Sequence, residues 1–151
     1  MRHGVATEAE LAGLSGREQL EAMLAGRLPG PTMAATLDFT LVEVDAGRVV
    51  FAGAPGERFL NPAGTVHGGW ALTLIDSATG CAAHSLLAPG QRYTTIETKA
   101  NFSRPVLPGS GDVRCEGRVI SAGRRVISAD ATLRDAGGRV LAHGTSTLLV
   151  L

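Results

Sequence analysis

The sequence has few cysteines, no long apolar run and no excess of either charge. Its 151 residues include two cysteines, too few for a disulfide framework, and neither lies in a CxxC or Cys/His pattern that would indicate zinc. Fourteen basic residues balance fourteen acidic ones, so the net charge attracts neither nucleic acid nor an anionic membrane. We therefore expect no metal or other cofactor, no nucleic-acid partner and no membrane partner.

Further absences narrow the class of protein. No apolar run reaches the ~18 residues that span a bilayer, and Arg2, Glu8 and Glu10 interrupt the start, where a signal peptide needs apolar residues. We therefore expect a cytoplasmic protein. No GxSxG motif occurs, which disfavours a Ser/His/Asp hydrolase.

The first 32 residues predict a short helical extension. Ser15 and Glu18 fit a capping box, and apolar residues at helical spacing follow until Gly26. Residues 28–31 contain two prolines, which end the helix. We expect residues 1–32 to form a lid or packing arm, and residues 33–151 to form the main domain.

The main domain shows strand signals on both sides of one helix. Alternating residues predict a strand from Thr36 to Val44 and a second over 48–54. The helix should begin at Gly68 or Gly69 and end at Leu86 or Leu87, and a meander of four strands should follow, over residues 93–102, 112–121, 124–134 and 140–150. Such short connections join antiparallel strands. The sequence predicts an α+β fold in which an antiparallel sheet wraps around one long central helix.

Asp76 is the only carboxylate of the expected central helix. Most of its neighbours are small or apolar, so the helix should be buried on most sides. Burying an unpaired charge is costly, and no basic residue lies three or four positions away to pair with it. A functional site, an exposed helix face and a subunit contact are all open as explanations.

Several motifs occur in a fixed order around this helix: Asn61-Pro-x-Gly64-x-x-His67-Gly68-Gly69, Asp76-Ser77-Ala78, Thr94-Thr95-x-Glu97, and Asn101-Phe102-x-Arg104-Pro105. With this spacing the chain resembles the hotdog-fold acyl-CoA thioesterases, most closely the PaaI-like group of the phenylacetate pathway. The resemblance implies hydrolysis of an aryl- or short- to medium-chain acyl-CoA to the free acid and CoA. It also implies a homodimer, often paired again into a tetramer, whose active sites each use two chains; the choice between dimer and tetramer stays open.

The resemblance assigns the chemistry to the central helix and its start. Gly68 and Gly69 would offer backbone N–H groups to the thioester oxyanion. Asp76 would be the nucleophile or the general base that activates water. Alternatively, the glycines only shape a turn, and Asp76 caps a loop or faces a neighbouring chain.

Supporting roles follow from the same resemblance. Asn61 would hold the nucleophilic water or the Asp76 carboxylate, although an Asn before Pro also suits an ordinary turn. His67 would position the loop, with base catalysis as the alternative. Thr95 would orient water or substrate from the opposing chain, and Thr94 could take its place. Threonine is also a common strand residue.

Three arginines are candidates for binding the phosphates of CoA: Arg104, Arg124 and Arg125. They could instead be solvated arginines in turns. Two other functions stay open for the whole chain. One is a catalytically silent acyl-CoA-binding protein of the same fold, and the other is a hotdog dehydratase or hydratase, whose HFPGxP-type motif the sequence lacks.

Overall fold

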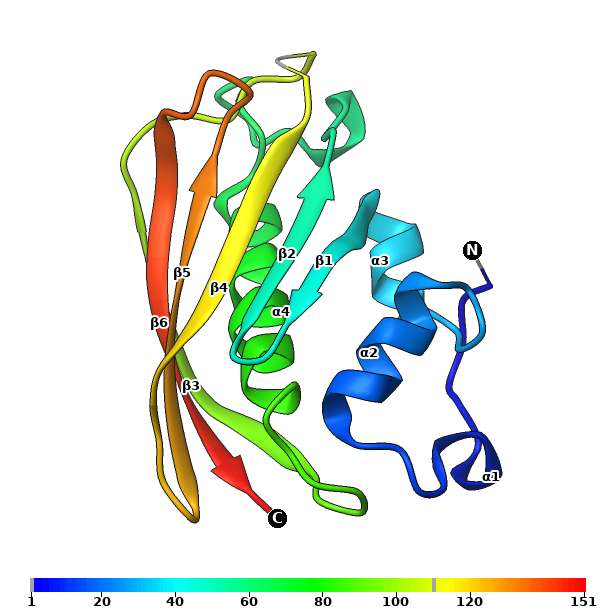
Figure 1. Cartoon of the computed structure of the whole chain (residues 1–151). Helices are drawn as coiled ribbons and strands as arrows, with labels where there is room; N and C mark the ends of the chain where they lie inside the picture. Colours follow the sequence, from blue (N-terminus) through cyan, green and yellow to red (C-terminus); the bar gives the residue numbers. More distant parts are fainter. Residues whose placement is uncertain (1, 110) are drawn as a thin grey trace.

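The computed structural model of the chain shows one antiparallel sheet and one long helix, α4 (Gly68–His84) (Figure 1). The structure describes residues 2–109 and 111–151. The six strands are β1 (Phe39–Asp45), β2 (Arg48–Gly53), β3 (Tyr93–Phe102), β4 (Val113–Ala122), β5 (Val126–Arg134) and β6 (Val140–Val150). Their order in the sheet is β1-β2-β4-β5-β6-β3, and every neighbouring pair is antiparallel. The predicted α+β architecture is confirmed.

The predicted meander was wrong at β3. Strands β4, β5 and β6 are consecutive neighbours, but β3 pairs with β6 at the edge of the sheet and not with β4. The connection after β3 passes over the start of α4, where the Val66 N–H donates to the Val106 carbonyl at 2.9 Å. Val106 is buried at this point, and the chain enters the sheet again at β4, on the far side of β5 from β6.

Helix α4 lies against all six strands on the concave face of the sheet (Figure 1). Close approach depends on two glycines of the sheet. A Cβ added at Gly117 would lie 2.3 Å from the Ala78 carbonyl oxygen, and one at Gly144 would lie 2.9 Å from Cγ2 of Ile75. A side chain at either position would push the helix off the sheet. The helix begins where the sequence predicted and ends at His84, slightly earlier than expected.

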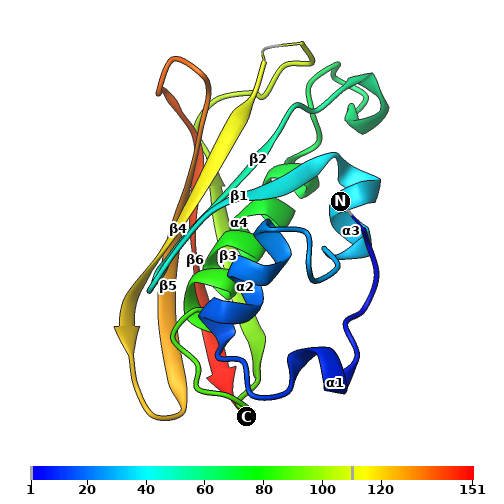
Figure 2. The same ribbon diagram turned by 45° about the vertical axis from the view of Figure 1, so that its right-hand side comes forward.

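Residues 2–31, called the arm below, precede the main body and contain α1 (Glu8–Leu11) and α2 (Gly16–Leu24). The predicted capping box of α2 is confirmed, since Ser15 and Glu18 each accept a hydrogen bond from the other's backbone N–H. Helix α2 crosses in front of α4 (Figure 2). The division into an extension over 1–32 and a main domain over 33–151 stays a prediction.

Helix α3 (Thr32–Leu37) stands where the sequence predicted the start of the first strand. Thr36 and Leu37 are helical and β1 starts at Phe39, so the predicted strand start was wrong. The Trp70 indole N–H donates to the Leu37 carbonyl at 2.8 Å. This bond to α4 satisfies a carbonyl at the end of the short helix, and local sequence cannot show such a contact.

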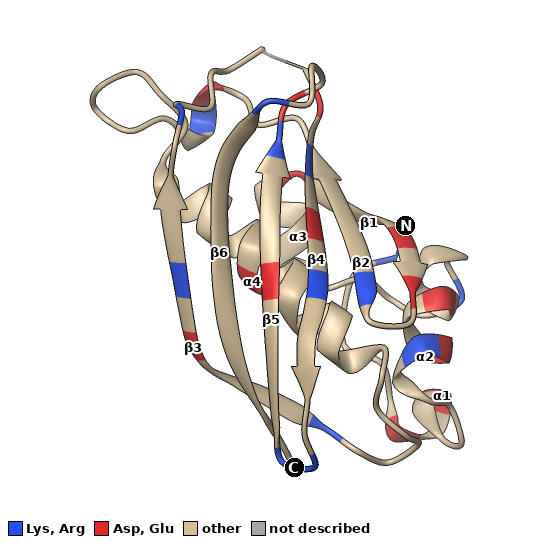
Figure 3. Cartoon of the chain, turned by 60° about the vertical axis from the view of Figure 1, so that its left-hand side comes forward, with Lys and Arg blue, Asp and Glu red and all other residues tan. Residues whose placement is uncertain are grey.

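Acidic and basic residues occur together on β1, β2 and β4 (Figure 3), and several of them form ion pairs. Arg48 on β2 donates to Glu43 at 2.6 Å and to Glu116 at 2.7 Å. Ion pairs that water still reaches contribute about 1 kcal/mol or less each, so the buried inner face carries most of the stability. In the part of the chain that the structure describes, no helix is long and apolar enough to cross a membrane.

Candidate active site

A tight loop over residues 61–67 leads into α4, and the Asn61 side chain organises it. Its Oδ1 accepts from the N–H groups of Ala63 (2.9 Å) and Thr65 (3.3 Å), and its Nδ2 donates to Oγ1 of Thr65 at 2.9 Å. Gly64 adopts φ +79°, a backbone conformation that favours glycine. The Asn61 amide is thus engaged within its own loop, and its role toward water or Asp76 stays a prediction.

His67 is the N-cap residue of α4. Its Nδ1 accepts from the Gly69 N–H at 3.0 Å, so the neutral ring carries its proton on Nε2. Its own N–H donates to the Phe59 carbonyl at 2.7 Å. These bonds fix the loop to the first turn of the helix.

The N–H groups of the first turn of α4 are not equivalent. Gly69 donates to the His67 ring and Trp70 to the His67 carbonyl, at 3.0 and 2.9 Å. The Gly68 N–H has no hydrogen-bond partner among the residues described. Gly68 borders a cavity of about 320 Å³ that Phe102 and Arg104 also line. Of the two predicted donors, Gly68 is therefore the one that is free at the positive end of the helix.

Asp76 lies two helical turns beyond Gly68, about 12 Å along the helix axis. Its side chain is exposed in the single chain. Of the three explanations for this acid, an exposed helix face is the one that fits a single chain. Gly68 and Asp76 border different cavities, so one chain does not bring the donor and the carboxylate together.

A series of hydroxyl groups reaches Asp76 from the core. The Thr98 hydroxyl donates to Oδ1 of Asp76 at 3.2 Å and lies 3.0 Å from Oγ of Ser146, which lies 2.7 Å from Oγ1 of Thr79. Thr79 and Ser146 are buried. No motif had indicated Thr98 or Ser146, and the only local signal was Thr79, three residues after Asp76 on the same helix face. The other carboxylate oxygen, Oδ2, has no partner among the described residues.

Asp76 also borders a cavity of about 450 Å³ between the arm and α4, called the arm cavity below. Thr95 of β3 lines the same cavity, as does Cys81. Burial, with a smaller effect of the Asp76 carboxylate, raises the pKa of the Cys81 thiol to about 12, so this thiol is protonated at neutral pH and is a poor nucleophile. Asp76 is the only carboxylate among the described residues that line the arm cavity.

Cys115 is a small residue of the main core. It is fully buried, and burial raises the pKa of its thiol to about 12. Among the described residues, no group of three or more His, Cys, Asp or Glu side chains is arranged to hold a metal ion.

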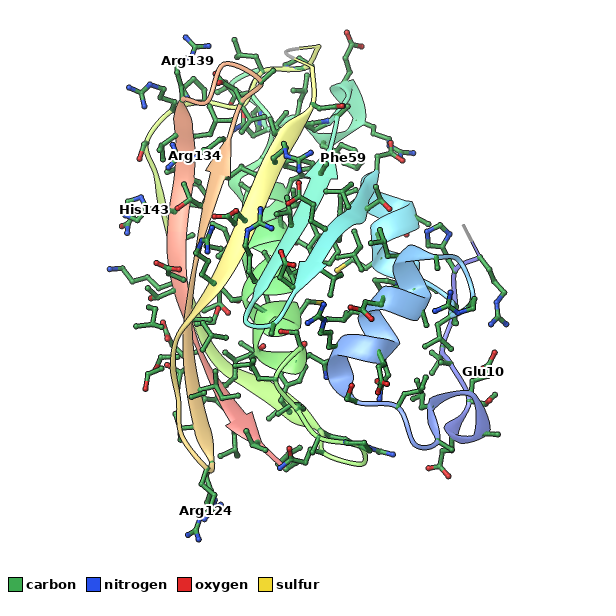
Figure 4. The ribbon with its side chains drawn as sticks, viewed as in Figure 1. Glu10, Phe59, Arg124, Arg134, Arg139 and His143 are labelled. Carbon is green, nitrogen blue, oxygen red and sulfur yellow. The ribbon has the colours of Figure 1, made fainter. Side chains whose placement is uncertain are left out.

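The three candidate arginines do not gather in one chain. Arg104 lines the Gly68 cavity, and its guanidinium donates to the Val140 carbonyl at 2.8 Å. Arg124 and Arg125 lie in the β4–β5 turn. Figure 4 shows Arg124 at the end of the sheet opposite Phe59, which contacts the start of α4. A single chain therefore presents Arg104 and Arg124 to different regions.

Thr94, the predicted alternative to Thr95, is exposed on β3.

The sheet wrapped around α4, with a free N–H at one end of the helix and an exposed acid in its middle, defines a hotdog-fold protein with a candidate hydrolytic site. A model of the thioesterase superfamily matches residues 63–142. This chain belongs to that superfamily. A candidate esterase of Saccharolobus solfataricus is 30% identical over 115 residues, which cover 76% of this chain and 80% of that protein.

Solved structures agree with this assignment. A candidate thioesterase from Ralstonia eutropha JMP134, described as a phenylacetic acid degradation-related protein, is 29% identical with a TM-score of 0.79, covering 87% of this chain and 98% of that one. A Streptococcus mutans UA159 protein, solved with acetyl-CoA bound, is 25% identical with a TM-score of 0.69, covering 76% and 89%. The resemblance to PaaI-like thioesterases is confirmed.

Proposed function

We propose that this protein hydrolyses acyl-CoA thioesters at sites that two copies of the chain build together. The proposal rests mainly on two groups: the exposed carboxylate of Asp76, and the Gly68 N–H at the start of the helix, which lacks a partner among the described residues. Membership of the thioesterase superfamily supports the reaction class. The acetyl-CoA bound to the Streptococcus mutans relative supports acyl-CoA as the substrate class.

The free edge of β3 supports a homodimer. This strand pairs with β6 alone among the described strands, and its Ile96 and Phe102 are each 58% exposed. An unpaired edge with exposed apolar side chains is a ready interface. Antiparallel pairing of two β3 strands about a two-fold axis would set the two α4 helices antiparallel. Asp76 of one chain would then approach Gly68 of the other, which supplies the half of the site that each chain lacks. Two such dimers would form a tetramer.

The reaction follows from these groups. Asp76, as general base, takes a proton from water while the water oxygen attacks the thioester carbon. The Gly68 N–H stabilises the oxyanion, which collapses, expels the CoA thiolate and leaves the free acid. Asp76 as nucleophile would instead form an anhydride that water cleaves. Thr95 and Asn61 would orient water or substrate, His67 and Gly69 would hold the donor turn, and Arg104, Arg124 and Arg125 would bind CoA phosphates.

A panel of acyl-CoAs with a thiol reagent tests this function. We expect wild-type protein to release CoA, and Asp76→Asn to lower kcat by about 10²–10⁴. The melting temperature should hardly change, because the Asp76 side chain is exposed. Asp130→Asn, at an exposed acid of β5, is the matched control and should keep activity. If wild-type protein releases no CoA from any thioester, the chain is a non-catalytic binder; wild-type turnover in Asp76→Asn would remove Asp76 from the mechanism.

A further inference from the structure

The arm cavity is a compartment whose walls come from three parts of one chain. The arm contributes aliphatic side chains, and α4 contributes both Asp76 and His84. These two residues are eight positions apart, so the cavity follows α4 for about 12 Å. Tyr93 and Thr95 of β3 complete the wall. The carboxylate therefore stands beside an elongated and mainly apolar space. The aliphatic residues that the arm contributes include Leu11, Leu20, Met23 and Leu28.

Specific contacts hold the arm on α4. The Gly16 N–H donates to the Leu87 carbonyl at 3.0 Å, and a Cβ added at Gly16 would lie 1.8 Å from the His84 carbonyl oxygen. The His84 ring pairs with the Gln19 side chain at 3.0 Å between Nε2 and Oε1. Leu20 is 2% exposed and belongs to the main core. The arm is therefore a fixed wall of the cavity.

We propose that the arm cavity receives the apolar acyl or aryl group of the thioester, inside the same chain whose Asp76 acts on the carbonyl. This inference rests on the proposed function. A cavity of about 450 Å³ lies within the usual range of ligand pockets, about 300–1,000 Å³, and its apolar walls suit an acyl group. The CoA portion of the bound thioester then extends from this cavity toward Gly68 of the partner subunit. The arm precedes residues 63–142, which match the superfamily, so substrate length is set by a part of the chain outside that match.

A series of straight-chain acyl-CoAs, from acetyl to dodecanoyl, measures the pocket. Each buried methylene should raise kcat/KM about three- to fourfold until the cavity is full. Met23→Trp fills the cavity from α2, so the ratio of kcat/KM for octanoyl-CoA to that for butanoyl-CoA should fall about tenfold. Leu11→Trp fills the cavity from α1 and should lower the same ratio, so it replaces Met23→Trp if that variant does not fold. Leu24→Phe is the matched control, because Leu24 is 40% exposed and does not line the cavity, and its ratio should equal that of wild type.

Mixed dimers show which chain holds the acyl group. One chain carries Gly68→Pro and the other Asp76→Ala, so only the site with Asp76 from the first chain is complete. Met23→Trp placed on the Gly68→Pro chain should shorten the preferred acyl chain, whereas Met23→Trp on the Asp76→Ala chain should leave the wild-type preference.

Each outcome is decisive. The reverse pattern would place the acyl group in the other chain, and an unchanged ratio in Met23→Trp and Leu11→Trp would overturn the pocket. If wild-type protein hydrolyses nothing, the proposed function fails, and binding of non-hydrolysable thioether analogues of the same series then tests the pocket by the same ratio.

Discussion

The two parts of α4 that carry the candidate site are held in opposite ways. At its N-terminus, the Asn61 side chain and the His67 ring form hydrogen bonds within the chain, and the Gly69 N–H is bonded to that ring. The Gly68 N–H has no hydrogen-bond partner among the described residues. In its middle, Asp76 is exposed and has one hydroxyl partner, Thr98. The first region is a rigid donor, and the second is an acid beside an open cavity. The fold builds each half of the site separately, and in the function proposed above a second chain joins them.

The largest effect we expect in the donor region comes from Gly68→Pro. Proline lacks an N–H and is tolerated at the first position of a helix, and His67 has φ −58° and ψ 135°, which a following proline accepts. Loss of one oxyanion donor should lower kcat by about 10²–10³. Steady-state kinetics on the best acyl-CoA measures it.

Gly68→Ala is the matched control for this change. Both variants place a Cβ near the Phe102 ring, about 3.1 Å away before adjustment, but only alanine keeps the N–H. We expect the alanine variant to retain far more activity than the proline variant. Equal losses in the two variants would show that crowding against Phe102, and not the missing donor, is responsible.

A smaller effect is expected in the acid region from Thr98→Val, which keeps the shape of the side chain and removes its hydroxyl. Because this hydroxyl positions one oxygen of Asp76, kcat should fall about tenfold, the lower end for a hydrogen bond to a charged group. KM should change little, and Thr98→Ser should restore kcat. Thr145→Val, at an exposed threonine of β6, is the control. An unchanged kcat in Thr98→Val would mean that Asp76 needs no positioning from β3.

The smallest effect concerns stability near the arm cavity. Burial lowers the pKa of His84 below its ordinary value of 6.5, so the folded state binds this proton less readily than the unfolded state. The contribution of neutral His84 to the free energy of unfolding should therefore be complete above about pH 6.5. As the pH drops below this value, the free energy of unfolding should fall by at most about 1.4 kcal/mol per pH unit.

Urea unfolding between about pH 5 and pH 7.5 tests this slope. His84→Gln should flatten it, whereas His143→Gln, at an exposed residue of β6, should not. If the free energy of unfolding of His84→Gln still falls with pH as in wild type, other titrating groups are responsible for the slope.

Much of the fold could be predicted from local pattern. Strand β3 begins and ends at the predicted residues, because a segment rich in threonine and other strand-forming residues lies between flanking Pro–Gly and Arg–Pro turns. Helix α3 was missed because six residues are too few to show a helical period, and its end is fixed by the Trp70 indole from another element. The edge position of β3 was missed because pairing depends on long-range packing.

The candidate site was predictable where residues are adjacent in sequence. The His67-Gly68-Gly69 cap forms within one turn, although only the structure separates the engaged Gly69 N–H from the free Gly68 N–H. Thr98 and Ser146 could not be predicted, because a hydroxyl in a strand has no distinctive spacing. The exposure of Asp76 depends on what the arm and β3 leave uncovered, which composition does not show.

The most direct test of the two-chain site is activity in mixed dimers of Asp76→Ala and Gly68→Pro. The two chains carry different affinity tags, and only dimers that hold both are purified. Each parent homodimer should be almost inactive. The mixed dimer contains one site with an intact Asp76 and an intact Gly68, so it should recover about half of the wild-type activity per dimer, one of two sites. A mixed dimer no more active than its parents would contradict the account, since sites contained within single chains would all remain broken.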